Sequence, residues 1–473
     1  MPRPSKRSGA GPPAPDHDAA RLGPGDDGTD PTGPGPPPAL ARIARSAARR
    51  FGWGLGDQAV SSLTNFAVGV TVARSLGAEQ FGIFSLAWVT FGVVLNVSRG
   101  LATDPLTVRF SAVPTRTWRD GAVRATGTAL LTGLTTGAAA LLAGVALGGP
   151  FGGALVTLGI ALPALLLQDA WRFAFFAAGA GRKACVNDLA MAVALVPAML
   201  LATRAGTIEA FLLAWGGAAA VAALFGALQM HALPRLGGSR SWLVQQRDLG
   251  VRYLVENVSN SGGAQIRMYG LGAIAGLAAV GAVRGVELLL GPFLAVLMGL
   301  TLVAVPEAAR VLARSPRRLP LFCLALGGGQ VVAALLWGAG LLLLLPNAVG
   351  GWLLGAVWPI ASTLIVPATL GVMGASMCSG AAAGLRALGA ARRGLRAQLL
   401  ASAAYVTGGL VGAALGGALG SAWGVAAATT SSAVVWWLQL RTGLREHRRT
   451  ASAPAPEPDS EPVRLDDDEM RTP

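Results

Sequence analysis

The sequence predicts an all-α integral membrane protein of about 12 transmembrane helices, in two six-helix lobes related by a pseudo-twofold axis along the membrane normal. Three observations predict this fold. Between residues 53 and 440, apolar runs of roughly twenty or more residues follow one another, the length that a helix needs to cross the ~30 Å hydrocarbon core. Arginine gathers after every second run, and the two halves of the chain resemble each other.

The apolar runs set the predicted helices. In chain order the predicted spans are 54–75, 80–99, 122–147, 152–179, 184–203, 208–232, 253–275, 279–304, 320–345, 354–382, 397–416 and 419–440. The connections between them are short, so no soluble catalytic domain is expected. A composition of 53% hydrophobic and 13% charged residues also argues against a soluble globule.

Basic residues mark one side of the predicted bundle. By position, 27 lysines and arginines lie before the first run or after every second run, against 2 (Arg74 and Arg204) on the opposite connections. The positive-inside rule places the arginine-rich side and both termini in the cytoplasm, which requires an even number of crossings. We expect a multi-pass protein of the bacterial cytoplasmic (inner/plasma) membrane. The net charge of +14 then implies attraction to anionic membrane lipids and no nucleic-acid partner.

The predicted organisation has five segments. They are a disordered cytoplasmic N-tail (1–40), an N-lobe with helices one to six (41–233), a cytoplasmic inter-lobe loop (234–252), a C-lobe with helices seven to twelve (253–440) and a disordered cytoplasmic C-tail (441–473). The tails are rich in Pro, Gly and acidic residues and cannot bury enough apolar surface to offset the entropy of ordering. The N-tail has no apolar core typical of a signal peptide.

An internal repeat relates the two lobes. A shift of 199 residues places Gly77, Gly82, Gly92 and Gly100 on Gly276, Gly281, Gly291 and Gly299. Near the end of each half, a shift of 210 places Gly179, Arg182 and Lys183 on Gly389, Arg392 and Arg393. Six helices per half is an even number, so both lobes enter the membrane from the same side. Parallel repeats of this kind build transporters with alternating access.

Charged residues within predicted spans are candidate site residues, because a charge at the bilayer centre costs about 2.5–3.5 kcal/mol on insertion scales. Arg267 lies near the centre of the seventh helix with no acid one turn away. It is either a cationic cavity group for an anionic headgroup or a buried arginine held by carbonyls or a distant acid. Arg284 and Glu287, three residues apart, can form a structural ion pair on one helix face or line the cavity.

A second set of polar residues has two interpretations each. Asp169 and Arg172 repeat the spacing of three and are either an ion pair or a coupling site. Asp57 and Glu256, equivalent in the repeat, are predicted at the starts of the first and seventh helices, where a carboxylate caps the helix or couples a cation. The mid-helix residues Asn65 and Gln265 serve either as interhelical contacts or as sugar ligands.

Several function classes lack their motifs. There is no G-x-x-x-x-G-K-[ST] motif, so ATP hydrolysis by this chain is not expected. Three histidines and three cysteines are too scattered for a metal site, and no cofactor is predicted. No catalytic residue is assigned, and we expect that the protein is not an enzyme.

Two stretches carry a family resemblance. Residues 54–88 read GLGDQAVSSLTNFAVGVTVARSLGAEQFGIFSLAW, and residues 275–292 read AGLAAVGAVRGVELLLGP. The first resembles the opening two helices of bacterial polysaccharide exporters, members of the multidrug/oligosaccharidyl-lipid/polysaccharide flippase superfamily. The informative part is the helix end at Ala73–Gly77 followed by Glu79–Gly82. The second stretch is similar to the start of the family's second lobe.

The resemblance implies a V-shaped flippase that moves a polyprenyl-diphosphate-linked saccharide, or a related polysaccharide precursor, across the membrane. It implies a central cavity with cationic groups for the lipid diphosphate, to which Arg267 and Arg284 would contribute. The first helix offers only Arg74, near its outer end. A lipid-linked glycan is then the substrate, and glycan-assembly enzymes are expected as further partners. Twelve crossings, against fourteen in some relatives, leave out an additional lipid-binding helix pair.

Three alternatives remain open. A multidrug or other small-molecule antiporter of the same superfamily would need acidic cavity residues. An integral-membrane glycan polymerase or transferase would need a large external loop with Arg, His or acids, and the outer connections are nearly bare. A major-facilitator carrier would show a Gly/Asp/Arg-rich loop between helices two and three, which residues 99–105 do not resemble.

Overall fold

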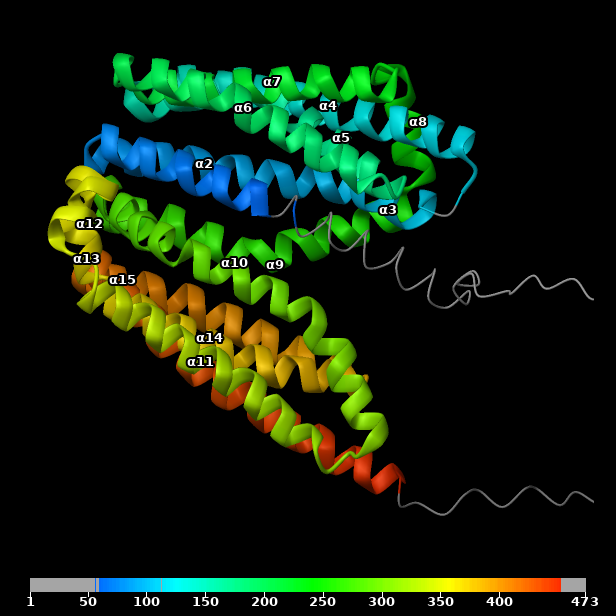
Figure 1. The fold of residues 1–473 in the computed structure, drawn as a ribbon, viewed down its shortest axis with the longest axis vertical. Helices are drawn as coiled ribbons and strands as arrows, with labels where there is room; N and C mark the ends of the chain where they lie inside the picture. Colours follow the sequence, from blue (N-terminus) through cyan, green and yellow to red (C-terminus); the bar gives the residue numbers. More distant parts are fainter. Residues whose placement is uncertain (1–55, 57–58, 112, 452–473) are drawn as a thin grey trace, which may run out of the picture. The chain divides into compact units, whose positions relative to one another are not determined.

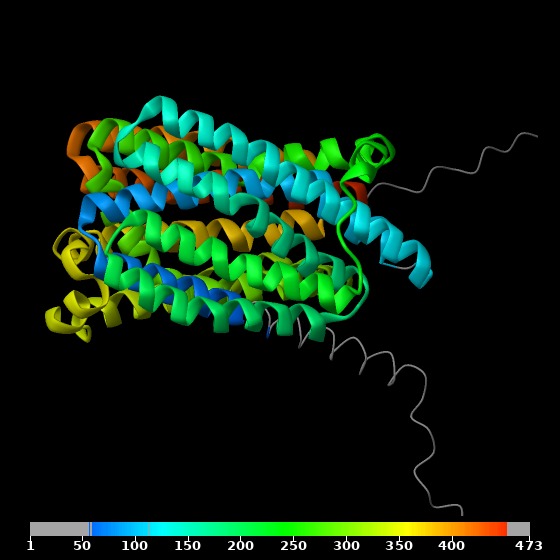
Figure 2. The ribbon, with the colours of Figure 1, turned by 90° about the horizontal axis from the view of Figure 1, so that it is seen from above.

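The computed structural model describes residue 56, residues 59–111 and residues 113–451, all within one compact unit of residues 49–473. The described residues form helices joined by short turns, and no strand occurs among them. Figure 1 and Figure 2 show the long helices running side by side. The predicted all-α membrane fold class is confirmed, whereas the count of twelve crossings stays a prediction.

The first half contains a helix over residues 59–75, followed by α2 (Ala78–Ser98), the π-helical segment η1 (Arg99–Thr103), α3 (Asp104–Phe110), α4 (Thr115–Leu147), α5 (Gly149–Ala177), α6 (Gly181–Ala205) and α7 (Ile208–Met230). A 3-10 turn, η2 (Leu236–Gly238), and α8 (Ser239–Gln245) lead to the second half. That half contains α9 (Arg247–Ala275), α10 (Leu277–Arg314), α11 (Leu319–Leu343), α12 (Asn347–Leu354), η3 (Gly355–Val357), α13 (Trp358–Thr363), α14 (Ile365–Ala387) and α15 (Ala391–Ala451).

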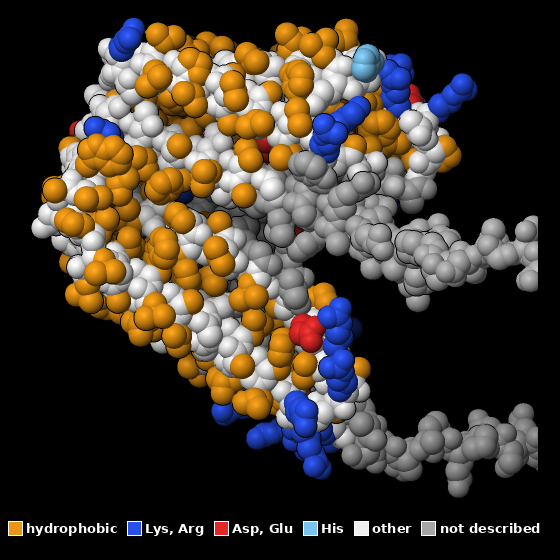
Figure 3. Space-filling model, in the orientation of Figure 1, with side chains coloured by type: hydrophobic (Ala, Val, Ile, Leu, Met, Phe, Trp, Pro, Cys, Tyr) orange, Lys and Arg blue, Asp and Glu red, His pale blue; other side chains and the backbone are white. Residues whose placement is uncertain are grey.

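Nine helices of the described part are long and apolar enough to cross a membrane. One of them, α15, covers the two predicted spans 397–416 and 419–440. Its backbone breaks between these spans at Gly416 and Gly417, where Gly417 has a φ of 58°. The predicted first and seventh spans correspond to the helix over residues 59–75 and to α9, which fall outside these nine. On the face drawn in Figure 3, hydrophobic side chains are spread over the helix surfaces, and basic side chains gather where α10 and α15 end.

Three boundaries differ from the prediction. The span predicted as one helix over 354–382 is divided into η3, α13 and α14, with a turn at Gly355 whose φ is 54°. Residues 234–252 are mostly helical rather than a loop, because Trp242 of α8 is buried and its Nε1 donates to the Leu101 carbonyl at 3.1 Å. Residues 441–451 continue α15 instead of starting a disordered tail. The predicted tail over 1–40 lies outside the described residues.

Among the described residues, one buried hydrophobic cluster joins the two halves near one end of the molecule. We call the end that carries the turns near residues 76, 148, 206 and 276 the short-turn end, and the opposite end the basic end. One hydrophobic cluster combines Val72 and Phe81 with Val280, Leu354 and Trp358, so both halves share it near the short-turn end. Towards the basic end the core divides in two, around Trp171 and Trp242 in the first half and around Cys323 and Trp436 in the second.

Equivalent turns display the repeat in the backbone. Helices α5 and α14 end at Ala177 and Ala387, 210 residues apart, and α6 and α15 begin at Gly181 and Ala391, again 210 apart. The glycines between them, Gly179 and Gly389, both have a φ of 67°. Their N–H groups donate to carbonyls three residues earlier, at 2.9 and 3.0 Å. The shift of 210 therefore pairs positions of α5 and α6 with positions of α14 and α15.

Candidate functional site

A cavity of about 740 Å³ lies between the helix over residues 59–75 and four helices of the second half, α9, α10, α14 and α15. We call it the central cavity. Its walls are mainly apolar, with side chains such as Phe66, Leu288 and Val425. Its ionisable lining residues are Arg267, Arg284, Glu287 and Tyr405. An apolar wall with a few convergent polar groups is typical of ligand sites.

Two arginines share one carboxylate in this cavity. Arg267 Nη2 donates to Glu287 Oε1 at 2.9 Å, and Arg284 Nη1 donates to Glu287 Oε2 at 3.2 Å. The predicted pair of Arg284 and Glu287 is thus formed. Arg267, which has no acid one turn away on its own helix, is paired with this acid of α10. The group of three carries a net charge of +1, because two guanidinium groups face one carboxylate.

Arg267 is held by protein on several sides. Its side chain is only 5% exposed, against 33% for Glu287 and 30% for Arg284. The Arg267 guanidinium lies 5.2 Å from the ring centre of Tyr405, a distance at which a cation and a π system attract each other. Its stem packs against Gly409 of α15, where a Cβ atom would lie 2.7 Å from Arg267 Cδ. Within the described part of the chain, the Arg267 Nε has no hydrogen-bond partner.

The other cavity candidates separate in space. Asn65 lines the central cavity, as predicted for a polar contact. Gln265 instead lies against α2, with its Nε2 3.1 Å from the position of a Cβ on Gly92. Arg74 is exposed at the short-turn end, and its guanidinium lies 4.6 Å from the Trp352 ring centre. Arg74 does not line the central cavity, because it lies beyond the end of the helix portion that does.

The first half contains a second charged group, around a pocket of about 120 Å³ that we call the first-half pocket. Arg99 donates to both carboxylate oxygens of Asp169, at 2.6 and 3.0 Å. Arg172 lies 3.3 Å from a carboxylate oxygen of Asp188. The prediction that Asp169 and Arg172 pair with each other along α5 is therefore replaced by pairing with other helices. Two cations facing two anions leave the group neutral.

Buried amides complete this group. Gln168 Nε2 donates to Asp188 Oδ1 at 2.9 Å, and Asn187 Nδ2 donates to the Ala222 carbonyl at 2.8 Å. Gln168, Asn187 and Asp188 are all buried. Such hydrogen-bonded polar groups hold helices in one relative arrangement, since breaking them leaves unpaired groups in an apolar interior. This arrangement favours a structural role for Asp169 and Arg172.

The two repeat-related carboxylates have different outcomes. Asp57 lies outside the described residues. Glu256 is exposed on α9, nine residues after Arg247 begins that helix. The prediction that Glu256 caps its helix is wrong, because α9 begins two turns before the predicted boundary and its free N–H groups lie near Arg247. Within the described ranges, no group of three or more His, Cys, Asp or Glu side chains could hold a metal ion.

Sequence reasoning missed three site residues. The sequence places Arg99 at the end of a predicted span, among the basic residues of a connection, whereas the helix continues to Phe110. Asp188 lies inside the predicted span 184–203, and that position was a usable signal. Tyr405 carried no signal, since a single tyrosine in an apolar helix does not reveal which neighbour it faces.

Comparisons with known proteins place this geometry among membrane transporters by fold. No protein-family model and no curated protein sequence matches the chain. Solved structures do match. An inward-facing multidrug resistance MATE family transporter of the MOP superfamily has a TM-score of 0.69 and 16% identity, over 83% of this chain and 96% of its own. The lipid II flippase MurJ, in an inward closed conformation, has a TM-score of 0.61 and 11% identity, over 85% and 89%.

A MOP superfamily transporter from Pyrococcus furiosus, described as having a binding pocket of reverse polarity, also matches. Its TM-score is 0.54 and its identity 16%, over 85% of this chain and 96% of its own. The fold and the apolar helices define the class: this is a multi-pass membrane protein with the fold of MOP superfamily transporters. At these identities the likeness establishes the fold and leaves the substrate to the chemistry of the cavity.

Proposed function

We propose that this protein is a flippase of the bacterial cytoplasmic membrane that moves a polyprenyl-diphosphate-linked saccharide, or a related polysaccharide precursor, by alternating access. The observation that carries the proposal is the central cavity with a net charge of +1 from Arg267, Arg284 and Glu287. A guanidinium group matches the geometry of a phosphate. The apolar walls suit the start of an isoprenoid chain.

The division of the core supports alternating access. Near the short-turn end both halves share one core, and towards the basic end each half has its own. If the basic end is cytoplasmic, as the positive-inside rule predicts, this arrangement suits a state open to the cytoplasm. A substrate assembled on the cytoplasmic side would then enter between the halves.

The proposal is tested with purified protein in liposomes, by following the transfer of a fluorescent prenyl diphosphate between leaflets. Arg284 is the residue to change first, because it is partly exposed to the cavity and Glu287 keeps Arg267 as a partner. Arg284→Gln is expected to slow transfer by about tenfold or more, since a hydrogen bond to a charged group contributes ~1.5–3 kcal/mol. Arg310→Gln, at an exposed pair with Glu307, is the control and should transfer normally.

Arg267→Ala is expected to abolish export, but it also removes a buried partner of Glu287. Folding of that variant must be checked by its elution as a single species in detergent. Prenyl diphosphate transfer at the normal rate in both Arg284→Gln and folded Arg267→Ala would refute the assignment of these arginines to the substrate.

A multidrug antiporter is the second candidate, favoured by the TM-score of 0.69 with a MATE family transporter. A cationic drug needs an available carboxylate, and Glu287, Asp169 and Asp188 each face an arginine. Uptake of ethidium by the same liposomes, without transfer of the prenyl diphosphate, would favour this candidate.

A further inference from the structure

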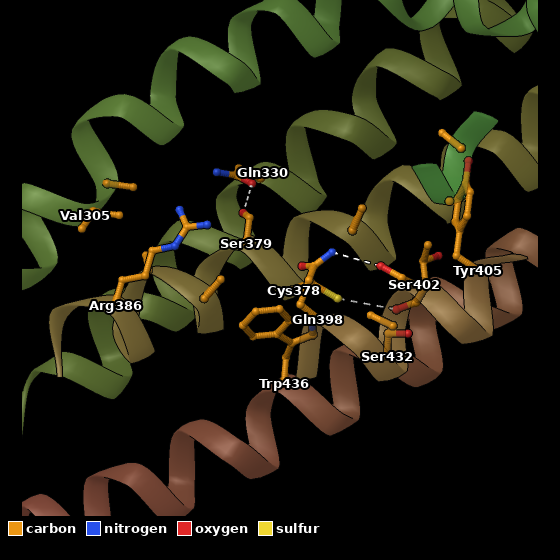
Figure 4. Close-up of a pocket in the computed structure, with 18 residues that line it drawn as sticks. Val305, Gln330, Cys378, Ser379, Arg386, Gln398, Ser402, Tyr405, Ser432 and Trp436 are labelled. Atoms are coloured by element: carbon orange, nitrogen blue, oxygen red, sulfur yellow. Dashed lines mark hydrogen bonds between the residues drawn. The ribbon is translucent and has the colours of Figure 1, made fainter. Parts of the chain in front are cut away.

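A separate cavity of about 400 Å³ lies within the second half, and we call it the second-half pocket (Figure 4). Helices α9, α10, α11, α14 and α15 line it. Tyr405 and Thr429 line both this pocket and the central cavity, so they form part of the partition between the two. This pocket plays no part in the function proposed above.

The second-half pocket occupies the place that the repeat equates with the first-half pocket. The shift of 210 places Gln168, Asp169, Arg172 and Asp188 on Cys378, Ser379, Ala382 and Gln398. All four residues of the first set line the first-half pocket, and all four of the second set line the second-half pocket. The two pockets are therefore the same site in two copies of one fold.

The copies differ in charge and in free volume. In the first half, Asp169 and Asp188 pair with arginines, and a pocket of about 120 Å³ remains. In the second half, short neutral side chains such as Ser379 and Ala382 stand at those positions, and a pocket of about 400 Å³ remains. The second copy has thus lost its internal ion pairs and gained room for a ligand.

One charged residue lines the second-half pocket. Among the described residues that line it, Arg386, in the last turn of α14, is the single charged side chain, and none of them is Asp, Glu, Lys or His. In the part of the chain that the structure describes, the Arg386 guanidinium has no ion-pair or hydrogen-bond partner, whereas Arg99 and Arg172 in the first copy both face carboxylates. In Figure 4 its guanidinium points towards Gln330 and Ser379.

Polar groups surround the same space. Gln330, in the middle of the apolar helix α11, is 4% exposed, and its Oε1 accepts a hydrogen bond from the Ser379 hydroxyl at 2.7 Å. The same hydroxyl also lies 2.9 Å from the Ser376 carbonyl. With its Oε1 turned to Ser379, the Gln330 amide keeps its NH₂ group as a donor. Gln398 and Ser402, which bond each other at 3.2 Å, lie on another wall. The rest of the lining is apolar, with Val305 and Trp436 among it.

We propose that the second-half pocket binds the phosphate group of an amphiphile, with Arg386 as its cation and Gln330 as a hydrogen-bond donor. A cation without an internal counter-ion, in a pocket with amide donors and apolar walls, matches a phosphate attached to an apolar chain. The phosphate belongs either to an isoprenoid or to an anionic membrane lipid, and this site is independent of which substrate crosses the central cavity.

The competing explanation is that Arg386 is one more basic residue at the basic end. Arg392 supplies the matched control, because it lies six residues further along and is exposed like Arg386 but does not line the pocket. If only charge at this end matters, Arg386→Gln and Arg392→Gln must have equal effects.

Cys378 allows a local measurement, because it lines the pocket and is half-buried. In the full chain with Cys185→Ala and Cys323→Ala, Cys378 is the one remaining thiol of the sequence. The rate of its alkylation by N-ethylmaleimide is measured in phosphatidylcholine nanodiscs. The probes are farnesyl diphosphate, dihexanoyl phosphatidylglycerol and inorganic phosphate, with farnesol as the uncharged control.

We expect farnesyl diphosphate or dihexanoyl phosphatidylglycerol to slow alkylation and farnesol to leave it unchanged. Protection by the first alone assigns the isoprenoid, and protection by the second alone assigns the membrane lipid. Arg386→Gln should lower the affinity for the protecting probe by about tenfold or more, and Arg392→Gln should leave that affinity unchanged. Ser379→Asp, which copies Asp169 of the first half, should lower this affinity by a similar factor, because it gives Arg386 a carboxylate partner within the protein.

Ser379→Asp also covers the case in which Arg386→Gln fails to fold. The proposal is overturned if no amphiphilic phosphate protects Cys378, if farnesol protects it as well, or if inorganic phosphate alone does. It is also overturned if the two arginine variants lose the same affinity, or if Ser379→Asp and folded Arg386→Gln both keep the normal affinity.

Discussion

Gly82 of α2 and Gly281 of α10 form a reciprocal contact. A Cβ atom on Gly82 would lie 1.8 Å from the carbonyl oxygen of Leu277, and one on Gly281 would lie 2.3 Å from that of Ala78. The two glycines are 199 residues apart, and so are the two carbonyl residues. A twofold axis between two equivalent surfaces requires this exchange of partners. Equivalent surfaces of the two halves therefore contact each other where α2 and α10 begin, at the short-turn end.

Larger residues at these glycines should prevent the two helices from meeting. Gly82→Val and Gly281→Val each place atoms inside the contact distance of a backbone carbonyl, so we expect similar losses of transport from both. The double variant should lose less than the sum, because both changes separate the same contact. Transfer of the fluorescent prenyl diphosphate in liposomes measures this.

Gly340→Ala is the matched control, since a Cβ there meets nothing within 4 Å. It should transport normally. Unequal effects of Gly82→Val and Gly281→Val, with one near normal, would contradict a reciprocal contact.

Glu287→Gln should destabilise the protein without abolishing binding of an anion. The change leaves Arg267 and Arg284 without their shared carboxylate, and Arg267 is almost fully buried. Because Glu287 is one-third exposed, we expect a loss of about 1–3 kcal/mol in the free energy of unfolding, below the full cost of breaking a buried pair. Thermal unfolding in detergent measures the loss.

Glu307→Gln, which breaks the more exposed pair with Arg310, should cost about 0–1 kcal/mol. Equal melting temperatures for the two variants would argue that the group around Glu287 does not stabilise the fold.

The bond between Arg99 and Asp169 should show strong coupling in a double-mutant cycle of Arg99→Gln and Asp169→Asn. It is bidentate, and the Asp169 side chain is 10% exposed. We expect a coupling free energy of about 1–3 kcal/mol from thermal unfolding. The pair of Arg393 and Glu446, whose carboxylate is 56% exposed, serves as the comparison and should couple by about 0.2–1 kcal/mol. A larger coupling free energy for Arg393 and Glu446 than for Arg99 and Asp169 would contradict the argument that burial strengthens the coupling.

The link between α3 and α9 should depend on pH. Desolvation raises the pKa of the Asp248 carboxyl. The hydrogen bond and the charge of Arg109 lower this pKa by more than desolvation raises it, so the pKa lies below its ordinary value. A lowered folded-state pKa means that the stabilisation is present above the unfolded value of about 4 and is lost as the pH falls through the folded value.

Asp248→Asn should therefore have a lower melting temperature than the natural protein at neutral pH, and the difference should shrink as the pH falls below about 4. The exposed carboxylate of Glu256 offers a control, through Glu256→Gln, for charge changes on the same helix. A difference that grows as the pH falls would contradict the link.

The sequence by itself determined the properties that depend on composition and on spacing along the chain. Hydropathy and arginine spacing predicted the helical membrane fold, and the glycine register predicted the repeat now visible at Gly82 and Gly281. The pair of Arg284 and Glu287 was also predictable, since a spacing of three on one helix brings side chains together whatever the neighbours are.

The tertiary structure decided everything that depends on how one helix is rotated against another. Arg267 has no acid one turn away on its own helix and pairs with Glu287 of α10. Asp169 and Arg172 pair with residues of other helices, Arg99 and Asp188, instead of with each other. Gln265 faces α2 rather than the central cavity. Apolar periodicity around these helices is weak because both lipid and protein interior accept the same side chains, so the sequence carries little information about which face meets which neighbour.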